Sequence, residues 1–166
     1  MVTTKSNVNL SREETLNHDS EFNIWVLFSQ TCDTISRARK IELAQYRITS
    51  IQASVLFMLL LKGNGVTISE ISKWILREPH SVLTLINRMA NNGLVQKVKE
   101  TSDTKVRIIL TEKGRQLYTR TTRRSISLSF SVLSDDEKRQ LQPILKKLRA
   151  KTRKLLGWNY KAPFLP

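Results

Sequence analysis

The sequence predicts a mainly α-helical fold with one small β-hairpin, an α+β class, and three observations support this. Thr49, Thr67 and Ser134 each stand three positions before a Gln or Glu and open an apolar-periodic run, which is the capping box that starts a helix. Pro79 opens a further apolar stripe, which Gly93 ends. Beyond Gly93 the helical period is lost, and two short apolar runs with interleaved cations flank a polar stretch, as in a hairpin.

Six helices follow from these signals. The first carries an apolar residue every three or four positions from Glu21 onward, which predicts a long amphipathic helix. Pro79 suits a first helical turn because its missing N–H needs no partner there, and Gly93 suits a helix end. Thr111 is expected to cap one helix that continues to Val132. The expected helices cover residues 21–44, 49–62, 67–77, 79–92, 112–132 and 134–156.

These elements divide the chain into five parts. The expected strands, in LVQKVK and KVRIIL, complete a central module in which two short helices abut through a tight turn. The first and last helices have more apolar surface than this module can cover, so we expect them to pack against a partner. The predicted parts are a flexible N-terminal arm (1–20), a dimerisation helix (21–46), a helix-turn-helix and hairpin module (47–112), C-terminal dimerisation helices (113–157) and a tail (158–166).

The charge of the chain indicates a polyanionic partner. Lys and Arg number 28 against 14 acidic residues, which gives a formal net charge of +14 and a pI of about 10.3 over 166 residues. Such an excess is typical of proteins that bind nucleic acid. A basic surface that only keeps a protein in solution is the alternative, and charge by itself does not distinguish the two.

Several classes of protein are not expected. The single cysteine, Cys32, allows no disulfide within the chain and fits a reducing compartment. No apolar run approaches the roughly 18 residues of a membrane span, and the N-terminus lacks the apolar segment of a secretory signal, so a cytoplasmic protein without a membrane partner is expected. Metal-ligand spacings, phosphate-binding loops and nucleophile elbows are missing from the sequence. We therefore expect no enzyme, no cofactor and no metal.

The order of elements, from the long first helix through the helix-turn-helix and hairpin to two long helices, resembles the MarR family of bacterial transcription regulators. Members of this family are winged helix-turn-helix dimers with long N- and C-terminal dimerisation helices. The resemblance covers residues 22–156 and is most specific in PHSVLTLINRMANNGLVQKV and SDTKVRIILTEKG. The family's motif positions are occupied by Pro79, Val82, Arg88, Met89, Gly93, Leu94, Val95, Leu110, Thr111 and Gly114.

Two departures from the family pattern concern residues that face DNA. The wing of the family usually carries Asp-x-Arg, whereas this chain has Asp103-Thr104-Lys105. Lys is a point charge without the planar fork of Arg, so Lys105 cannot copy a bidentate contact in the minor groove. Leu83 stands where the family often has Ser or Thr.

The resemblance implies that helix 79–92 is a recognition helix in the major groove of DNA, where an α-helix fits and each base pair presents a distinct pattern. The face opposite the apolar stripe carries side chains suited to this role: an amide for adenine, hydroxyls for phosphates or bases, and an aliphatic group for a thymine methyl. An alternative for Arg88, late in the helix, is a phosphate or a neighbouring acid. The predicted base-facing and phosphate-facing residues are His80, Ser81, Leu83, Thr84, Asn87 and Arg88.

The hairpin adds four cations, and alternation along its strands should place several on one side. We favour contacts with phosphates or the minor groove. Edge-strand lysines that guard against aggregation are the alternative. The predicted wing contacts are Lys97, Lys99, Lys105 and Arg107.

A homodimer is expected from the apolar surface of the terminal helices. A two-fold dimer would present two recognition helices to adjacent major grooves, roughly 34–36 Å apart, so double-stranded DNA with a palindromic operator is the predicted partner. The predicted dimerisation residues are Phe22, Trp25, Phe28, Ile35, Leu141, Leu145, Leu148 and Leu155.

The resemblance also implies a small aromatic or anionic effector, bound between the dimerisation helices and the wing module. Trp25, Phe57 and Trp74 are the aromatic candidates for such a site, although aromatic residues at helical spacing more often belong to a core. Cys32 lies on the apolar stripe of the first helix, and a buried, unreactive thiol is expected there rather than a peroxide sensor.

The sequence therefore predicts a sequence-specific DNA-binding transcriptional regulator, a homodimeric repressor of a nearby promoter that a small ligand releases. The alternative is a winged-helix module for non-specific nucleic-acid binding or for protein interaction. The two differ in the ratio of operator affinity to random-DNA affinity.

Overall fold

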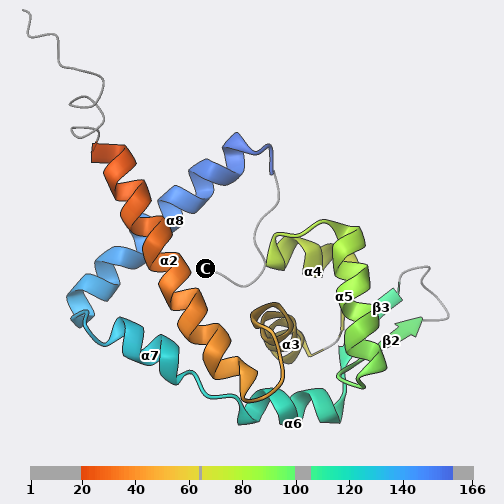
Figure 1. The fold of residues 1–166 in the computed structure, drawn as a ribbon. Coiled ribbons are helices and arrows are strands. Elements are labelled where there is room, and N and C mark those ends of the chain that lie inside the picture. Colours follow the sequence, from red (N-terminus) through yellow and green to blue (C-terminus); the bar gives the residue numbers. More distant parts are fainter. Residues whose placement is uncertain (1–19, 64, 100–105, 159–166) are drawn as a thin grey trace, which may run out of the picture. The chain divides into compact units, whose positions relative to one another are not determined.

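The structure, a computed structural model, describes residues 20–63, 65–99 and 106–158 (Figure 1). Nearly all of the predicted N-terminal arm and tail, together with the wing tip that contains Lys105, lie outside the described residues. The helices and strands are α2 (Ser20–Ala44), α3 (Ser50–Lys62), β1 (Val66–Thr67), α4 (Ile68–Ile75), α5 (Pro79–Asn91), β2 (Val95–Lys99), β3 (Val106–Leu110), α6 (Glu112–Arg120), α7 (Arg124–Phe130) and α8 (Asp135–Leu155).

The three predicted capping boxes are all formed, and the predicted mainly helical fold class is confirmed. At the start of α3 the backbone N–H of Gln52 donates to Thr49 Oγ1 at 3.2 Å, and the backbone N–H of Thr49 donates to Gln52 Oε1 at 2.9 Å. Reciprocal pairs of the same kind open α4 and α8. These local bonds satisfy backbone donors that a helix start leaves without partners.

A three-stranded antiparallel sheet in the order β1-β3-β2 contains the predicted hairpin. Within the hairpin, Lys97 pairs with Ile108 and Val98 pairs with Arg107. The two-residue strand β1 was not predicted, and it pairs Val66 with Ile108. Its second residue, Thr67, also caps α4, so β1 ties the first helix of the helix-turn-helix to the sheet.

The hydrophobic core lies among α3, α4, α5 and the sheet, and the end of α2 and α6 contribute to it. Its largest fully buried side chains are Leu43, Leu56, Met58, Ile71, Ile86, Met89 and Ile108. Burying an aliphatic side chain of this size stabilises the fold by roughly 1.5–3 kcal/mol. This core therefore sets the positions of the two helices of the helix-turn-helix.

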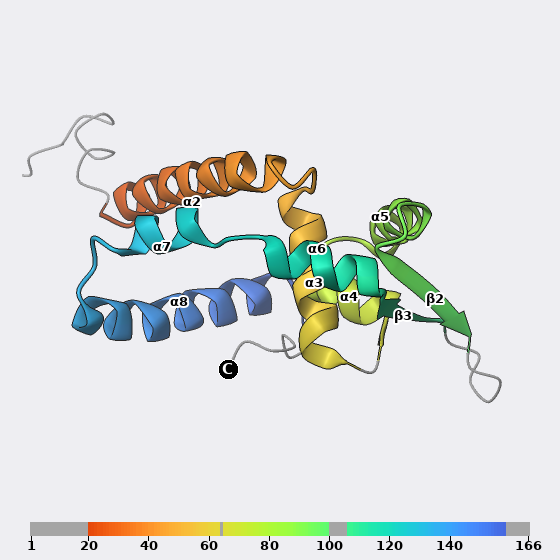
Figure 2. The same ribbon diagram turned by 90° about the horizontal axis from the view of Figure 1, so that it is seen from below.

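Gly114 permits the close approach of α6, which packs against α3 (Figure 2). A Cβ atom built on Gly114 would lie 2.1 Å from the carbonyl oxygen of Leu94 and 2.9 Å from a methyl group of Leu110. Because a backbone atom is the nearest neighbour, no side-chain rotation can relieve the clash. Gly114 is thus required by packing.

The single helix predicted over 112–132 is wrong, because the chain forms two helices, α6 and α7, with a break at residues 121–123. Thr121 has an extended backbone with ψ 129°, and α7 begins after Arg123. Tyr118 near the end of α6 is buried in the core with an exposed fraction of 8%. The break is held by a contact from a distant helix, that of Glu42 in α2.

Glu42 is the one buried charged residue among those that the structure describes. Its carboxylate accepts hydrogen bonds from Arg39, from the hydroxyls of Thr122 and Ser125, and from the backbone N–H groups of Arg124 and Ser125. Burial by itself would raise the pKa of Glu42. The hydrogen bonds from Ser125, Thr122 and Arg39 outweigh burial and lower the pKa from 4.5 to about 2.

Two compact units are distinguished, residues 1–37 and 38–166, and their boundary lies within α2. Cys32, in the first unit, is exposed, so the expected burial of its thiol is wrong for the isolated chain. The buried residues of α2 are Glu42 and Leu43, both in its last turn. The apolar stripe nearer the start of the helix, where Cys32 lies, is therefore not covered by the rest of this chain. The domain limits predicted from the sequence stay a prediction.

We expect Gly114→Ala to lower the free energy of unfolding by about 1–3 kcal/mol, the usual cost of forcing extra volume into a packed site. Chemical unfolding followed by circular dichroism measures this. Gly63→Ala is the comparison: Gly63, the residue that ends α3, would gain a Cβ that meets nothing within 4 Å, so its cost is limited to backbone strain at φ 69°. Equal or smaller destabilisation by Gly114→Ala would contradict the packing role.

We expect the stability of the protein to depend on pH through Glu42. Its folded-state pKa lies below the ordinary value of 4.5, so its contribution is present above about pH 4.5 and is lost as the pH falls towards 2. Glu42→Gln should cost about 2 kcal/mol at pH 7. Chemical unfolding at a series of pH values should show the difference between the two proteins shrinking below pH 4.5, and a constant difference would contradict this assignment.

Candidate nucleic-acid interface

The helix α5 is oriented so that its polar side faces solvent. Val82, Ile86 and Met89 are fully buried, so the opposite side of the helix is turned towards solvent. The six residues predicted to face DNA, His80, Ser81, Leu83, Thr84, Asn87 and Arg88, are all exposed. The structure therefore brings these six together on one accessible surface.

The turn between α4 and α5 is tight because Leu76 adopts a left-handed backbone, with φ 55° and ψ 48°. The hydroxyl of Ser72 donates to the carbonyl of Arg77 at 2.5 Å, and the backbone N–H of Leu76 bonds to the carbonyl of Ser72. Pro79 then starts α5 at its first position. These contacts determine where α5 begins relative to α4.

Two hydrogen bonds on the exposed face of α5 limit what its residues can offer to DNA. Thr84 Oγ1 donates to the carbonyl of His80 at 3.2 Å, within the same helix. Lys97 Nζ, on β2, donates to the side-chain oxygen of Asn87. A bidentate contact of Asn87 with adenine needs that oxygen as an acceptor, so such a contact would require Lys97 to move away.

The predicted wing cations lie on two faces of the sheet. Residues paired directly across antiparallel strands share a face, and successive residues alternate. Lys97 and Lys99 therefore share one face, while Arg107, which pairs with Val98, lies on the other. Lys97 and Lys99 are exposed and Arg107 is half-buried.

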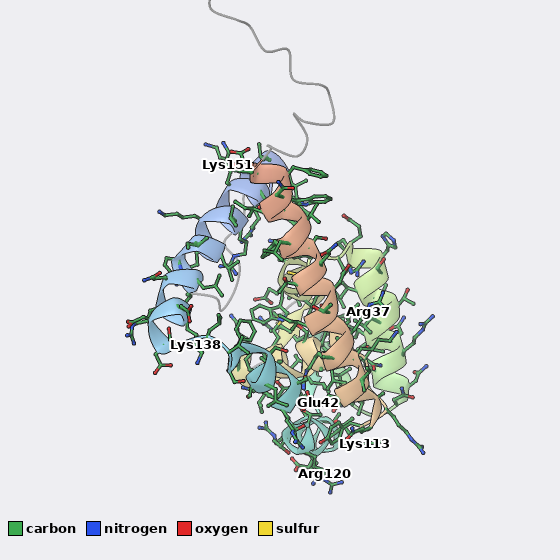
Figure 3. The ribbon with its side chains drawn as sticks, turned by 60° about the vertical axis from the view of Figure 1, so that its left-hand side comes forward. Arg37, Glu42, Lys113, Arg120, Lys138 and Lys151 are labelled. Atoms are coloured by element: carbon green, nitrogen blue, oxygen red, sulfur yellow. The ribbon has the colours of Figure 1, made fainter. Side chains whose placement is uncertain are left out.

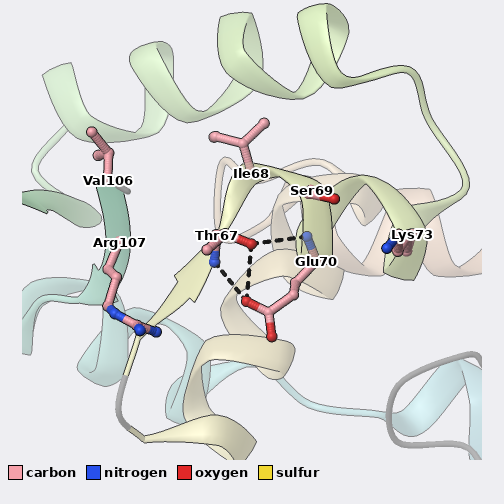
Figure 4. A pocket seen from close by; sticks show the side chains of 7 residues that line it. All are labelled: Thr67, Ile68, Ser69, Glu70, Lys73, Val106 and Arg107. Carbon is pink, nitrogen blue, oxygen red and sulfur yellow. Dashed lines mark hydrogen bonds between the residues drawn. The ribbon is translucent and has the colours of Figure 1, made fainter. Parts of the chain in front are cut away.

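Arg107 instead lines a hollow between β3 and the start of α4 (Figure 4). The hollow has a volume of about 680 Å³, and its lining includes Thr67, Ser69, Glu70, Lys73, Val106 and Arg107. Burial would raise the pKa of Glu70, but hydrogen bonds from Thr67 and the nearby charges of Lys62 and Arg107 lower it. Glu70 is thus occupied as a helix cap, bonded to Thr67, and the cations Lys73 and Arg107 line the same hollow.

A second hollow, of about 450 Å³, lies between α5 and the start of α3. Its lining includes Ser81 and Arg88, which were predicted to contact DNA, and Arg77, which was not. Lys73, Arg77 and Ser69 were missed because the sequence reasoning looked only at the recognition helix and the wing. The polar positions of the preceding helix, Ser69 and Lys73 four residues apart, were the available signal.

Phe57 and Trp74, two of the three predicted effector contacts, lie together in an aromatic cluster. Their ring centroids are 6.3 Å apart, and the ring of Tyr118 lies 6.1 Å from that of Phe57. Trp74 Nε1 donates to Ser54 Oγ at 3.0 Å, and the guanidinium of Arg123 lies 5.4 Å from the Phe57 ring centroid. Trp25 belongs to the other compact unit.

Next to this cluster is a cavity of about 170 Å³, lined by Arg39, Leu43, Ser54, Phe57, Tyr118 and their neighbours. A cavity of about 150 Å³ is large enough to hold benzene. The aromatic walls and the guanidinium of Arg39 suit a small aromatic molecule that carries an acidic or polar group.

Apolar side chains are exposed at predicted dimerisation positions in each of the two compact units. Phe22 and Trp25 form a ring pair with centroids 5.5 Å apart, yet Trp25 is 60% exposed and Leu155 is 71% exposed. Most of the exposed large apolar side chains that the structure describes lie on α2, α7, α8 and the segments joined to them. Phe28 and Leu148 are also exposed, and Ile35, Leu141 and Leu145 are half-buried.

Within the described ranges, none of the helices combines the length and the apolar character needed to cross a membrane. The same residues contain no group of three or more His, Cys, Asp or Glu side chains placed to hold a metal ion.

Residues 48–114 match the family model described as a winged helix DNA-binding domain. The crystal structure of the organohalide-sensing transcriptional regulator RdhR with 2,4-dichlorophenol bound is 27% identical to this chain, covers 99% of both chains and gives a TM-score of 0.80. MepR from S. aureus, solved as a DNA complex, is 25% identical over 81% of this chain and 99% of its own, with a TM-score of 0.72.

A third solved structure, AbsC of the MarR family from Streptomyces coelicolor, is 18% identical over 87% of this chain and 97% of its own, with a TM-score of 0.75. At this identity the likeness shows a shared fold alone. No curated protein sequence matches the chain.

We expect Lys73→Ala and Arg107→Ala each to weaken binding to any DNA duplex, operator or random, because the hollow that they line suits a phosphate. Loss of one phosphate contact should reduce the slope of log K against log salt concentration by about 0.9. Fluorescence anisotropy over a salt series measures the slope. Lys151→Ala removes an exposed cation of α8 and should leave the slope unchanged, and a slope change equal to that of Lys73→Ala would contradict the assignment.

Proposed function

From the premise that the chain is a winged-helix, DNA-binding transcriptional regulator of the MarR type, we propose that it acts as a homodimeric repressor of a nearby promoter and that a small ligand releases it. In this proposal the two copies of α5 enter adjacent major grooves of a palindromic operator. The protein then has no catalytic role of its own, and it works in the cytoplasm, where the DNA is.

The exposed face of α5 carries the proposal. A helix whose buried side is fully apolar and whose other side bears His80, Ser81, Asn87 and Arg88 is suited to base edges and phosphates. The hollows on either side of the helix-turn-helix add Lys73, Arg77 and Arg107, and all are cationic. Base contacts would supply sequence specificity and these cations would supply affinity.

The homodimer is proposed from the exposed apolar surface of α2 and α8. Trp25, Phe28 and Leu148 are too exposed for a protein that functions as a single chain. In a two-fold dimer, exposed residues of each helix could pack against a second copy of the chain. Dimerisation would thereby bury the surface and set the spacing of the two recognition helices.

The proposed effector is a small aromatic compound with a phenolic or carboxylic group. The cavity beside Phe57 and Tyr118 supplies the aromatic walls, and Arg39 supplies a cation. The RdhR structure holds 2,4-dichlorophenol, a compound of this class. Repression would be relieved if the ligand-bound state disfavoured the spacing that the operator requires.

The proposal is tested by fluorescence anisotropy of the purified protein on DNA from upstream of its own gene, with a scrambled duplex as the reference. We expect tight binding to the upstream duplex that survives an excess of scrambled DNA, with one dimer for each palindromic footprint. Equal affinity for both duplexes, lost steeply with salt, would instead indicate non-specific nucleic-acid binding. Sedimentation equilibrium of the free protein tests the dimer separately.

We expect Ser81→Ala and Asn87→Ala each to lower operator affinity about tenfold while changing the affinity for scrambled DNA by less than twofold, because a base contact contributes about 1–3 kcal/mol of discrimination. The same anisotropy titrations measure both affinities. Gln116→Ala, an exposed residue of α6, is the control and should change neither. A parallel loss on both duplexes would assign Ser81 and Asn87 to phosphate contacts.

A further inference from the structure

The break between α6 and α7 is not marked by proline or glycine, although Thr121 bonds to the carbonyl of Tyr118 at the end of α6. Residues 118–131, which span it, contain neither proline nor glycine, the two residues that most often end a helix. The residue before α7, Arg123, makes no side-chain cap to the helix that follows. The start of α7 therefore lacks a cap from its own N-terminal residues, and its first backbone N–H groups need a partner from elsewhere in the chain.

The missing cap is supplied from another helix. The backbone N–H groups of Arg124 and Ser125, the first two residues of α7, donate to the Glu42 carboxylate at 2.8 and 3.2 Å. Glu42 lies on the last turn of α2, more than 80 positions earlier in the chain (Figure 3). A carboxylate at a helix start satisfies orphan N–H groups and interacts favourably with the helix dipole.

The same carboxylate also accepts hydrogen bonds from two side-chain hydroxyl groups, one in the break and one at the start of α7. Thr122 donates its hydroxyl to Glu42 Oε1, and Ser125 donates its hydroxyl to Glu42 Oε2. Arg39 completes the arrangement, since its guanidinium donates to Glu42 Oε2 at 2.8 Å and to the carbonyl of Thr122 at 2.5 Å. The two oxygens of Glu42 thus accept five hydrogen bonds, and three of the four bonded residues lie in the break or at the start of α7.

A continuous helix is incompatible with this set of bonds. In such a helix the N–H groups of Arg124 and Ser125 would bond to the carbonyls of Arg120 and Thr121. Those donors would then be unavailable to Glu42, and a buried carboxylate would lose partners at a high cost. An amide in place of the carboxylate offers one acceptor oxygen and adds a donor that faces other donors, so Glu42→Gln removes much of the preference for the broken form.

We propose that Glu42 is a positioning residue for operator binding. Its carboxylate keeps α6 and α7 as two separate helices, and so sets the direction in which α7 and α8 extend from the core formed by α3, α4, α5, α6 and the sheet. The proposal rests on the proposed function, because α8 is taken as part of the dimer. With the break closed, α7 would continue along the axis of α6, and the recognition helices of a dimer would no longer have the spacing that two half-sites require.

The first measurement is the distance between α6 and α8 within one subunit. Spin labels are placed at Gln116→Cys and Lys147→Cys in a Cys32→Ser background, and labelled protein is diluted with unlabelled protein so that most dimers carry labels on one subunit. We expect Glu42→Gln to shift or broaden the distance distribution. Glu137→Gln is the matched control, because Glu137 is also a helix-capping acid but lies on the exposed start of α8, and it should leave the distribution unchanged.

The second measurement is operator affinity. We expect Glu42→Gln to lower operator affinity at least tenfold, with less than threefold change on scrambled DNA and with a dimer mass that is unchanged by sedimentation equilibrium. Glu42→Asp, which keeps the negative charge, should recover part of the operator affinity. Unchanged label distances together with wild-type operator affinity in Glu42→Gln would overturn the proposal, as would an equal loss on both duplexes.

Two further results would need a different reading: a Glu42→Gln variant that does not fold, and a wild-type protein that prefers no operator. If Glu42→Gln does not fold, Thr122→Val and Ser125→Ala, which each remove one hydroxyl donor, should give smaller shifts in the same direction, and no shift in either overturns the proposal. If the wild-type protein shows no preference for any operator, the proposed function fails, while the label distances still decide whether Glu42 holds the break.

Discussion

The burial of one side of α5 is the constraint on which the candidate interface depends. Val82, Ile86 and Met89 fill the core, where α5 packs against α4 and β2, and a helix held by three buried side chains cannot rotate about its axis without exposing them. Each would lose roughly 1.5–3 kcal/mol of burial free energy. The opposite face, from His80 to Arg88, is therefore presented to solvent by hydrophobic packing, and its polar residues need no further support to stay accessible.

The surroundings of α5 turn a polar helix into a surface suited to a polyanion. Thr67 ends β1 and caps α4, and Lys73 of α4 and Arg107 of β3 both line the hollow of Figure 4. The alternation of β3 directs Arg107 to that hollow and away from the face of Lys97 and Lys99. Cations thus lie on both sides of the helix-turn-helix, where contacts with phosphates would position the protein while α5 contacts bases.

The end of α2 connects this interface to the helices with exposed apolar surface. Arg39 bonds to Glu42 and to the carbonyl of Thr122, and it also lines the cavity beside Phe57 and Tyr118. Leu43, the neighbour of Glu42, is fully buried in the hydrophobic core. A short stretch of one helix therefore contacts the core, the cavity and the break between α6 and α7.

Local patterns in the sequence determined most of the helix starts, the hairpin and the outward face of α5. Capping boxes, a proline at the first helical position and the spacing of apolar residues act between neighbours in the chain, so they can be recognised without a fold. Only the tertiary structure decided the strand β1, the place of Lys73 opposite Arg107 and the break before α7. These depend on contacts between residues far apart in sequence, above all those of the Glu42 carboxylate with residues 122–125, and no local pattern records such contacts.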